Sequence, residues 1–372
     1  MKQSKLTPAV HHAFPSPFPT TTGLDLGDRY SHFCVLDGRT GRSLEEGKVP
    51  TTRPALRELF ARLAPVRLVM EVGGQSPWVS RLAEEVGLEV IVANPRKTTL
   101  ISRNERKNDR TDAELLARLG RMDTKLLSPV QHRSATCQAD RAVIRSRLAA
   151  VGARTALINH ARGVLKSFGY RAPSCSTESF HNRVLGIVPK ELEPALLPIL
   201  HLIGQATAQI KSFDRTIHRL ADTTHTATKI LRQVPGVGPL IALAYVLTLE
   251  DPRRIRHARQ AGPYLGLVPR QDDSGDSTPQ LHITKTGDPL MRQLLVQGAN
   301  YILGHFGPDC DLRRFGLKIA AQGGKNAKKR ARVAVARRLA VLLHHLWRTG
   351  EVYDPFYLAK RRGEPVPTEL AG

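Results

Sequence analysis

Four carboxylates in three separate stretches of the chain could act together on one substrate. Asp25 follows a short apolar run, Glu71 ends another, and Asp109 and Asp112 lie three residues apart where a helix is expected to begin. Mg²⁺ takes oxygen ligands, and two such ions can hold the attacking and leaving oxygens of a phosphoryl displacement. The four acids are therefore candidate metal ligands for phosphate chemistry.

Each acid taken alone also has an ordinary structural explanation. Asp25 could be a turn residue, Asp109 a helix cap, and Asp112 a partner of the helix dipole. Asp28 and Asp37 are better explained as turn residues. Two strand-end acids combined with a helix-start pair favour one shared site over these separate explanations.

The charge of the chain indicates a polyanionic partner. The 372 residues include 56 Lys and Arg against 33 Asp and Glu, a formal net charge of +23. Basic surfaces displace condensed counterions from nucleic-acid phosphates, so nucleic acid is expected rather than a merely soluble basic protein. The four cysteines form no CxxC pair, no apolar run is long enough to span a membrane, and no signal peptide is expected. These features predict a cytoplasmic protein.

Apolar periodicity divides the chain into regions of different character. Strands alternating with helices predict an α/β domain first, and two long runs of helical spacing then predict an arm. A mainly α-helical domain is expected to follow the arm. The predicted segments are a disordered leader at 1–21, an α/β domain at 22–128, a helical arm or coiled-coil linker at 129–225, a C-terminal domain at 226–358 and a tail at 359–372.

Two basic or glycine-rich features in the C-terminal half could contact phosphates. Gly236 and Gly238 separate two helical runs in the manner of a helix-hairpin-helix, where backbone N–H groups can approach a phosphate. A plain turn between helices is the alternative. Residues 325–348 predict a basic amphipathic helix. The cations at its start are Lys328, Lys329 and Arg330.

A polar loop follows the glycine turn. Its serines, Ser274 and Ser277, lie in a stretch without apolar periodicity, and their spacing alone predicts a turn rather than a nucleophile. Asp288 before a proline predicts the start of the next helix. Lys285 and Arg292 are nearby cations that could neutralise a phosphate.

Six motifs in order resemble the insertion-sequence-110 family of transposases. They are GLDLGDRYSH, VMEVGG, KNDRTDAELLARL, VPGVGPLIA, GLVPRQDDSG and ITKTGDPLMRQLLVQGA. The resemblance extends from Gly23 to about Tyr357. In one place the chain departs from the common pattern, because Asp273 precedes the serine where relatives often have a second Ser.

The resemblance implies a fold and a mechanism. The fold would be an N-terminal RuvC-like, RNase H-type α/β domain, a helical arm, and a mainly α-helical transposase domain with a helix-hairpin-helix-like turn. The DEDD acids of the family correspond to Asp25, Glu71, Asp109 and Asp112, which would bind Mg²⁺, and its serine nucleophile corresponds to Ser274. The family also implies donor and target DNA, a bridge RNA as guide, and a homo-oligomer, a tetramer.

We therefore expect a recombinase that cleaves and rejoins DNA. The residues alone favour a metal-dependent nuclease with water as the nucleophile, and this stays open as the alternative. A non-catalytic nucleic-acid-binding protein is another. An actin-fold sugar kinase is a further alternative, but no second glycine-rich phosphate motif follows the first hairpin and the charge does not suit a small substrate.

Overall fold

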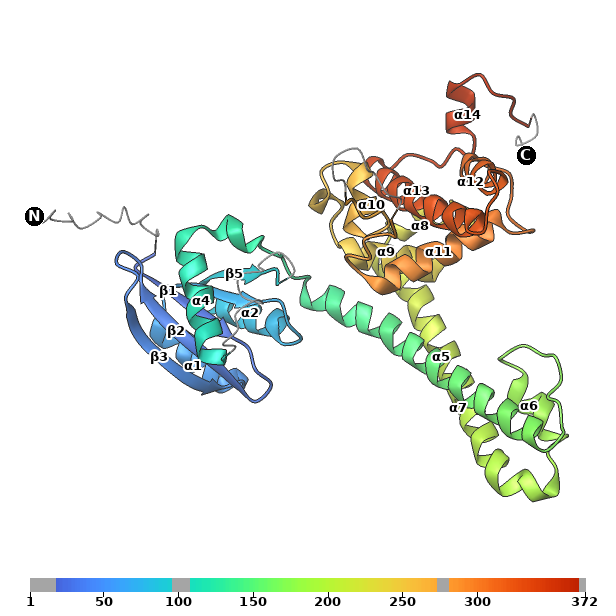
Figure 1. Cartoon of the computed structure of the whole chain (residues 1–372), viewed down its shortest axis with the longest axis horizontal. Helices are drawn as coiled ribbons and strands as arrows, with labels where there is room; N and C mark the ends of the chain where they lie inside the picture. The colour runs from blue at the N-terminus through green and yellow to red at the C-terminus, as the bar shows by residue number, and fades with distance from the viewer. Residues whose placement is uncertain (1–17, 96–107, 273–280, 368–372) are drawn as a thin grey trace, which may run out of the picture. The chain divides into compact units, whose positions relative to one another are not determined.

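The computed structural model describes residues 18–95, 108–272 and 281–367. The chain divides after Arg133 into two compact units (Figure 1). The first unit is a mixed α/β domain and the second is helical. Among the described residues, none of the helices combines the length and the apolar character that a membrane crossing requires.

A five-stranded mixed sheet organises the first unit. Its strands are β1 (Thr20–Asp25), β2 (Tyr30–Asp37), β3 (Ser43–Pro50), β4 (Arg67–Glu71) and β5 (Glu89–Ala93). Their order across the sheet is β3-β2-β1-β4-β5. The first three strands form an antiparallel meander, and β4 and β5 run parallel to β1. The carboxyl ends of β1, β4 and β5 therefore lie at one edge, which is where polar residues of parallel strands collect.

Helices cover both faces of this sheet (Figure 1). Helices α1 (Arg53–Leu63) and α2 (Ser76–Glu85) pack on one face, against Leu24, Phe33 and Val35. Helix α4 (Asp109–Met122) packs on the other face. Side chains in a strand alternate between faces, so Cys34 and Leu36 meet α4 while their neighbours Phe33 and Val35 do not.

Glycine allows α4 to approach the sheet closely. A Cβ atom on Gly23 of β1 would overlap the carbonyl oxygen of Ala113 and lie 2.6 Å from the Ala117 nitrogen. Two turns further along α4, a Cβ on Gly120 would overlap the Val69 side chain of β4. Small residues at these contacts therefore fix where α4 crosses the sheet.

The second unit begins with two long antiparallel helices that form the arm. Helix α5 (Ala135–Ser167) packs along α7 (Glu193–Arg219), with the short α6 (Phe180–Leu185) at one end. Arg147 and Asp214 form an ion pair across the two long helices at 2.6 Å. The buried Arg154 lies 3.4 Å from the Thr207 hydroxyl and 3.2 Å from the Thr177 hydroxyl. Polar contacts thus supplement the apolar packing of the arm.

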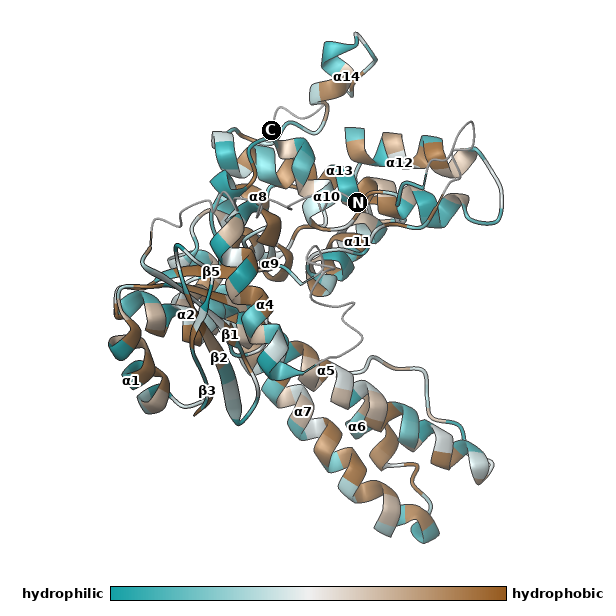
Figure 2. Cartoon of the chain, turned by 60° about the vertical axis from the view of Figure 1, so that its left-hand side comes forward, coloured by the Kyte–Doolittle hydropathy of each residue, from teal (hydrophilic) through white to brown (hydrophobic). Residues whose placement is uncertain are grey.

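The remaining helices surround α9 (Pro239–Leu249), which is buried from Ile241 to Leu249 and is hydrophobic on all sides (Figure 2). A helix apolar all round belongs in a core. The other helices of this part are α8 (Thr228–Leu231), α10 (Ala261–Tyr264), α11 (Pro289–Leu303), α12 (Asp311–Ala321), α13 (Ala327–Thr349) and α14 (Tyr357–Arg361). Residues of α11 and α13 share the hydrophobic core with α9. Short 3₁₀ or π turns occupy Thr124–Leu127, Lys190–Leu192, Leu220–Thr224, Pro252–Arg254 and Ala258–Gln260.

Most predicted elements are present, with small differences. Strand β1 begins at Thr20, so the leader boundary at 21 was placed too late. Within the predicted arm, the short α6 forms where Phe180 and Val184 are buried against the long helices. The predicted amphipathic helix corresponds to α13, in which Val335 is fully buried and Val333 is partly exposed.

Candidate functional site

Two of the four predicted acids end neighbouring parallel strands. The last register pair of β1 and β4 is Leu24–Met70, and Asp25 and Glu71 follow it by one residue each. Asp25 lies two residues after Gly23, and Glu71 lies two residues after Val69. Gly23 and Val69 both contact α4. Because side chains alternate, both carboxylates lie on the α4 face of the sheet.

The other two acids come from the first turn of α4. Asn108, rather than Asp109, caps this helix, since its side chain accepts a hydrogen bond from the Arg110 backbone N–H at 3.1 Å. Asp109 is exposed, whereas Asp112 is 7 % exposed and directly precedes Ala113, the residue against Gly23. Asp109 is therefore not the N-cap residue of α4.

A histidine that the sequence reasoning missed connects the two groups. His32 of β2 is the antiparallel register partner of Asp25, and its Nδ1 lies 3.5 Å from an Asp109 carboxylate oxygen. Opposite residues in antiparallel strands share a face of the sheet. The sequence signal was available, because His32 stands two residues before Cys34 on the α4 face. We call Asp25, His32, Glu71, Asp109 and Asp112 the acid end of the sheet.

The acid end has the donor chemistry of a site for a hard divalent cation. It offers four carboxylates and no thiolate, which suits Mg²⁺ or a similar ion rather than a soft metal. Within the described parts of the chain, no three His, Cys, Asp or Glu side chains are already grouped closely enough to hold an ion. The structure thus brings the four acids to one end of one face without closing them into a ligand set.

The predicted serine segment falls partly outside the described residues. Asp273, Ser274 and Ser277 belong to the stretch 273–280, which the structure does not describe. On either side of it the chain forms a short stem. The Arg270 N–H donates to the His282 carbonyl at 2.8 Å, and the Thr284 N–H donates to the Val268 carbonyl at 2.9 Å.

A tight turn leads from this stem into α11. Lys285 and Gly287 both have positive φ, and a Cβ on Gly287 would overlap the Tyr264 carbonyl oxygen. Asp288 caps α11 by accepting from the Met291 N–H at 3.1 Å, as predicted. Arg141 of α5 forms an ion pair with Asp288, and both side chains are largely buried. Nothing in the sequence signalled this pairing, because the two residues are 147 positions apart.

The predicted phosphate contacts have different surroundings. Arg292 donates to the carbonyl oxygens of Leu265, at 3.2 Å, and of Thr286, so its guanidinium supports the turn. Lys285 lines a large cavity of the second unit. The cations Lys328, Lys329 and Arg330 are exposed on the first turn of α13. They are the better placed of the predicted cations for a partner in solution.

The glycine turn has one glycine with a packing role and one without. Gly236 has a φ of +78°, and a Cβ there would lie 2.8 Å from the Gly298 carbonyl oxygen. Gly238 caps α9, and a Cβ there would meet nothing within 4 Å. A pocket of about 520 Å³ is formed by this turn together with Gln297 and Tyr301 of α11. The turn is therefore open to a ligand on its Gly238 side.

Comparison with known proteins places these features in a family. A family model described as "Transposase" matches residues 22–169, and one described as "Transposase IS116/IS110/IS902 family" matches residues 228–311. The first covers the acid end and all of α5, and the second covers the glycine turn and the serine segment. A transposase for insertion sequence element IS1111A from Coxiella burnetii is 28% identical over 344 residues, 89% of this chain and 90% of its own.

Two further relatives are also named as transposases. A probable family 20 transposase from Pseudomonas aeruginosa is 28% identical over 82% of this chain and 90% of its own. The transposase for insertion sequence element IS1328 from Yersinia enterocolitica is 28% identical over 76% of this chain and 84% of its own. Because the matching families and relatives are transposases, the chain is an enzyme that acts on DNA. The chain belongs to the IS110 family of transposases. Membership of this DEDD family implies dependence on divalent metal in general.

Proposed function

We propose that this transposase cleaves and rejoins DNA strands using Mg²⁺ at the acid end and Ser274 as the nucleophile. The observation that carries the proposal is the convergence of Asp25, Glu71 and the first turn of α4 on one face and one end of the sheet. Carboxylates gathered on a chain of net charge +23 suit a divalent ion that works on a phosphate of nucleic acid.

The sheet supports an RNase H-like, RuvC-like assignment of the first unit. An antiparallel meander followed by two parallel strands, in the order β3-β2-β1-β4-β5, is the arrangement that this assignment requires. It puts the first acid on the central strand and the second on its parallel neighbour. In this proposal, residues 22–128 form the RuvC-like domain, residues 129–225 the helical arm and residues 226–358 the transposase domain that carries the serine.

The residues of the acid end would have distinct tasks. Asp25, Glu71, Asp109 and Asp112 would hold the metal, which when bound stabilises charge on the phosphate oxygens. His32 would orient Asp109 across 3.5 Å. The glycine contact at Gly23 holds the first turn of α4 against β1, so it fixes Asp112 relative to Asp25.

Ser274 would form a covalent link to the DNA. Its Oγ would bond to the phosphorus as one sugar oxygen leaves, the serine losing a proton and the freed sugar gaining one. Attack by the hydroxyl of another strand would then restore a phosphodiester and the serine. A covalent intermediate divides one transfer into two steps and conserves the phosphodiester bond. The stem at 268–270 and 282–284 and the turn held by Asp288 and Arg141 would position this segment.

Nucleic acid would be held by Gly236 and Gly238 and by the cations Lys285, Arg292, Lys328, Lys329 and Arg330. A bridge RNA would choose donor and target DNA by base pairing, and the site would be assembled in a tetramer. The enzyme would act in the cytoplasm at the nucleoid. Purifying the full chain from cells that carry its element, and sequencing the bound RNA, tests the guide. If no element-encoded RNA is recovered with the protein, guidance by a bridge RNA is rejected.

A plasmid recombination assay tests the nucleophile. Ser274→Ala should abolish recombination, whereas Ser277→Ala, its neighbour in the same segment, should retain it. A denaturing gel of wild-type reactions should show protein covalently attached to DNA. If Ser274→Ala cuts DNA as well as wild type and no adduct forms, the enzyme is a metal-dependent nuclease with water as the nucleophile. If the wild-type chain neither cuts nor recombines DNA, and alanine at all four acids changes only its stability, the chain is a non-catalytic binding protein.

A further inference from the structure

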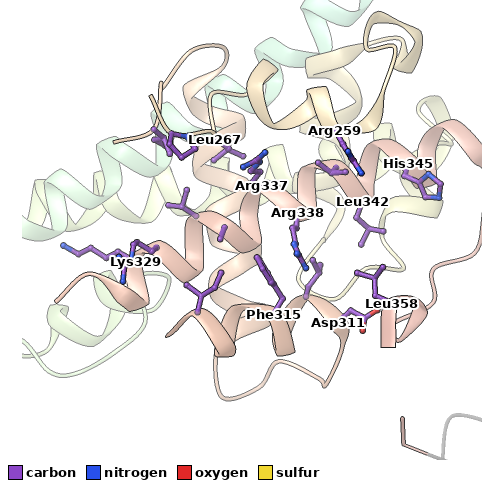
Figure 3. Close-up of a pocket in the computed structure, with 18 of the residues that line it drawn as sticks. Arg259, Leu267, Asp311, Phe315, Lys329, Arg337, Arg338, Leu342, His345 and Leu358 are labelled. Atoms are coloured by element: carbon purple, nitrogen blue, oxygen red, sulfur yellow. Dashed lines mark hydrogen bonds between the residues drawn. The ribbon is translucent and has the colours of Figure 1, made fainter. Parts of the chain in front are cut away.

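A large groove in the second unit takes no part in the strand cleavage proposed above, although three of the cations proposed to hold nucleic acid line it, namely Lys285, Lys329 and Arg330. It is a cavity of about 1290 Å³ along α13, with further walls from α12, α14 and the stem residues 281–285 (Figure 3). We call it the α13 groove. Lys329 and Arg337 line it eight residues apart, so these two cations lie about 12 Å apart along the helix.

The α13 groove is strongly cationic. Six basic residues line it: Arg259, Lys285, Lys329, Arg330, Arg337 and Arg338. Two carboxylates also line it, and both have other partners. Asp311 accepts from the backbone N–H groups of Leu358, at 2.6 Å, and Ala359, at 3.2 Å. Asp354 accepts from Lys360 at 2.9 Å. Six cations against two carboxylates leave the lining of the groove with a surplus of positive charge, which suits an anionic ligand.

The cations crowd one another at the centre of the groove. The Arg338 guanidinium stacks on the Phe315 ring, 3.3 Å from its centroid, and Arg337 is its neighbour on α13 (Figure 3). Burial lowers the pKa of Arg338, and the positive charges of Arg362 and Arg337 lower it further, while the negative charge of Asp311 partly offsets this. A bound anion would relieve this repulsion.

The lining between the cations is apolar. Val333, Val341 and Leu342 of α13 line the groove together with Phe315 of α12. Tyr357 at the start of α14 lines it too and is 52 % exposed. Cations beside apolar and aromatic surface suit a single nucleic-acid strand, whose phosphates meet the cations while its bases stack or lie on the apolar surface. A duplex hides its bases and would leave the apolar lining unused.

We propose that the α13 groove binds an unpaired nucleic-acid strand, with phosphates on Lys329 and Arg337 and a base against Tyr357. The repeated charge along α13 favours this occupant over an acidic protein helix. The inference rests on the proposed function only in that the enzyme handles nucleic acid. Binding measured with a chelator present needs neither bound metal nor cleavage by Ser274, so the two proposals can fail separately.

Fluorescence anisotropy of the full chain tests the groove. The probes are a labelled single-stranded DNA of about 16 nucleotides, its RNA counterpart and the matching duplex. The groove variant is Lys329→Gln with Arg337→Gln. The matched control is Lys318→Gln with Arg332→Gln, two exposed cations of α12 and α13 that do not line the cavity.

The groove variant should bind single strands at least about tenfold more weakly, and the slope of log K against log salt should fall by about 1.4, or about 0.7 for each phosphate that the variant no longer neutralises. The control variant should change the affinity for single strands and the salt slope far less. Tyr357→Leu should weaken single-strand binding about tenfold with little change in salt slope. Comparing the DNA and RNA probes identifies which strand is preferred.

Three results would overturn the proposal. Equal losses in the groove and control variants would show that general charge, and not the groove, holds the strand. A duplex that competes as well as the single strand would exclude an unpaired ligand. Unchanged binding in the groove variant, with an altered oligomeric state on size-exclusion chromatography, would assign the groove to contact with a second copy. Circular dichroism melting of each variant confirms that the protein is folded.

Discussion

Gly23 of β1 has no room for a side chain, because the carbonyl oxygen of Ala113 in α4 occupies the place of its Cβ. This contact lies two residues before Asp25 and one residue after Asp112. It is therefore the packing relationship that brings the helix acids to the strand acids, and the acid end depends on it.

Gly23→Ala should destabilise the first unit and reduce recombination. The added methyl must displace helix backbone, and overpacking of this kind costs about 1–3 kcal/mol. Thermal unfolding followed by circular dichroism measures the loss. Gly74→Ala is the control in the same unit, since a Cβ there meets nothing within 4 Å. If both variants melt at the wild-type temperature, α4 does not pack as described.

Glu71→Gln should remove at least about two orders of magnitude of recombination activity while leaving the melting temperature nearly unchanged. The amide keeps the shape but loses the charge that a divalent ion requires. Glu84→Gln, an exposed change on α2, should keep wild-type activity in the same plasmid assay. Equal activity of the Glu71→Gln and Glu84→Gln variants would show that Glu71 is not a residue of the metal site.

Arg141→Met should destabilise the second unit by about 3 kcal/mol, because it leaves the largely buried Asp288 carboxylate without its cation. Asp288→Ser, which can still cap α11, should lose less. In urea unfolding of both single variants and the double variant, the double variant should be more stable than the sum of the single losses predicts. Strict additivity would mean that the two side chains do not interact.

Asp37 should make stability sensitive to acid. Its carboxylate accepts from the Thr40 N–H at 2.5 Å and the Thr40 hydroxyl at 2.7 Å, and these bonds lower its pKa below the ordinary 3.8. A lowered pKa in the folded state adds stability above the ordinary value, which is lost as the pH falls through the folded pKa. Asp37→Asn should therefore flatten the fall in melting temperature below about pH 4. Parallel curves for the variant and wild type would contradict this.

The sequence was informative where a signal is local. Short apolar runs predicted the strands, and the helix starting near Asp109 was recognisable from its acids and its apolar spacing. The placement of Asp25 and Glu71 at strand ends followed from the same patterns.

Features that depend on distant contacts were not predictable. His32 reaches Asp109 because α4 packs across β1 and β2 on one face of the sheet, and Arg141 meets Asp288 at the start of α11. The sequence also could not show that Arg292 would bond backbone carbonyls. Such pairings are set by tertiary packing, which propensity and periodicity do not encode.

The central claim is that the acid end holds divalent metal, and titration of the full chain with Mn²⁺, followed by electron paramagnetic resonance, tests it most directly. Wild type should show saturable bound Mn²⁺ that Mg²⁺ displaces. Asp25→Asn with Asp112→Asn should lose it, whereas Asp28→Asn with Glu84→Gln should not. Undiminished Mn²⁺ binding in the Asp25 and Asp112 double variant would contradict the claim, as would the absence of saturable binding in wild type.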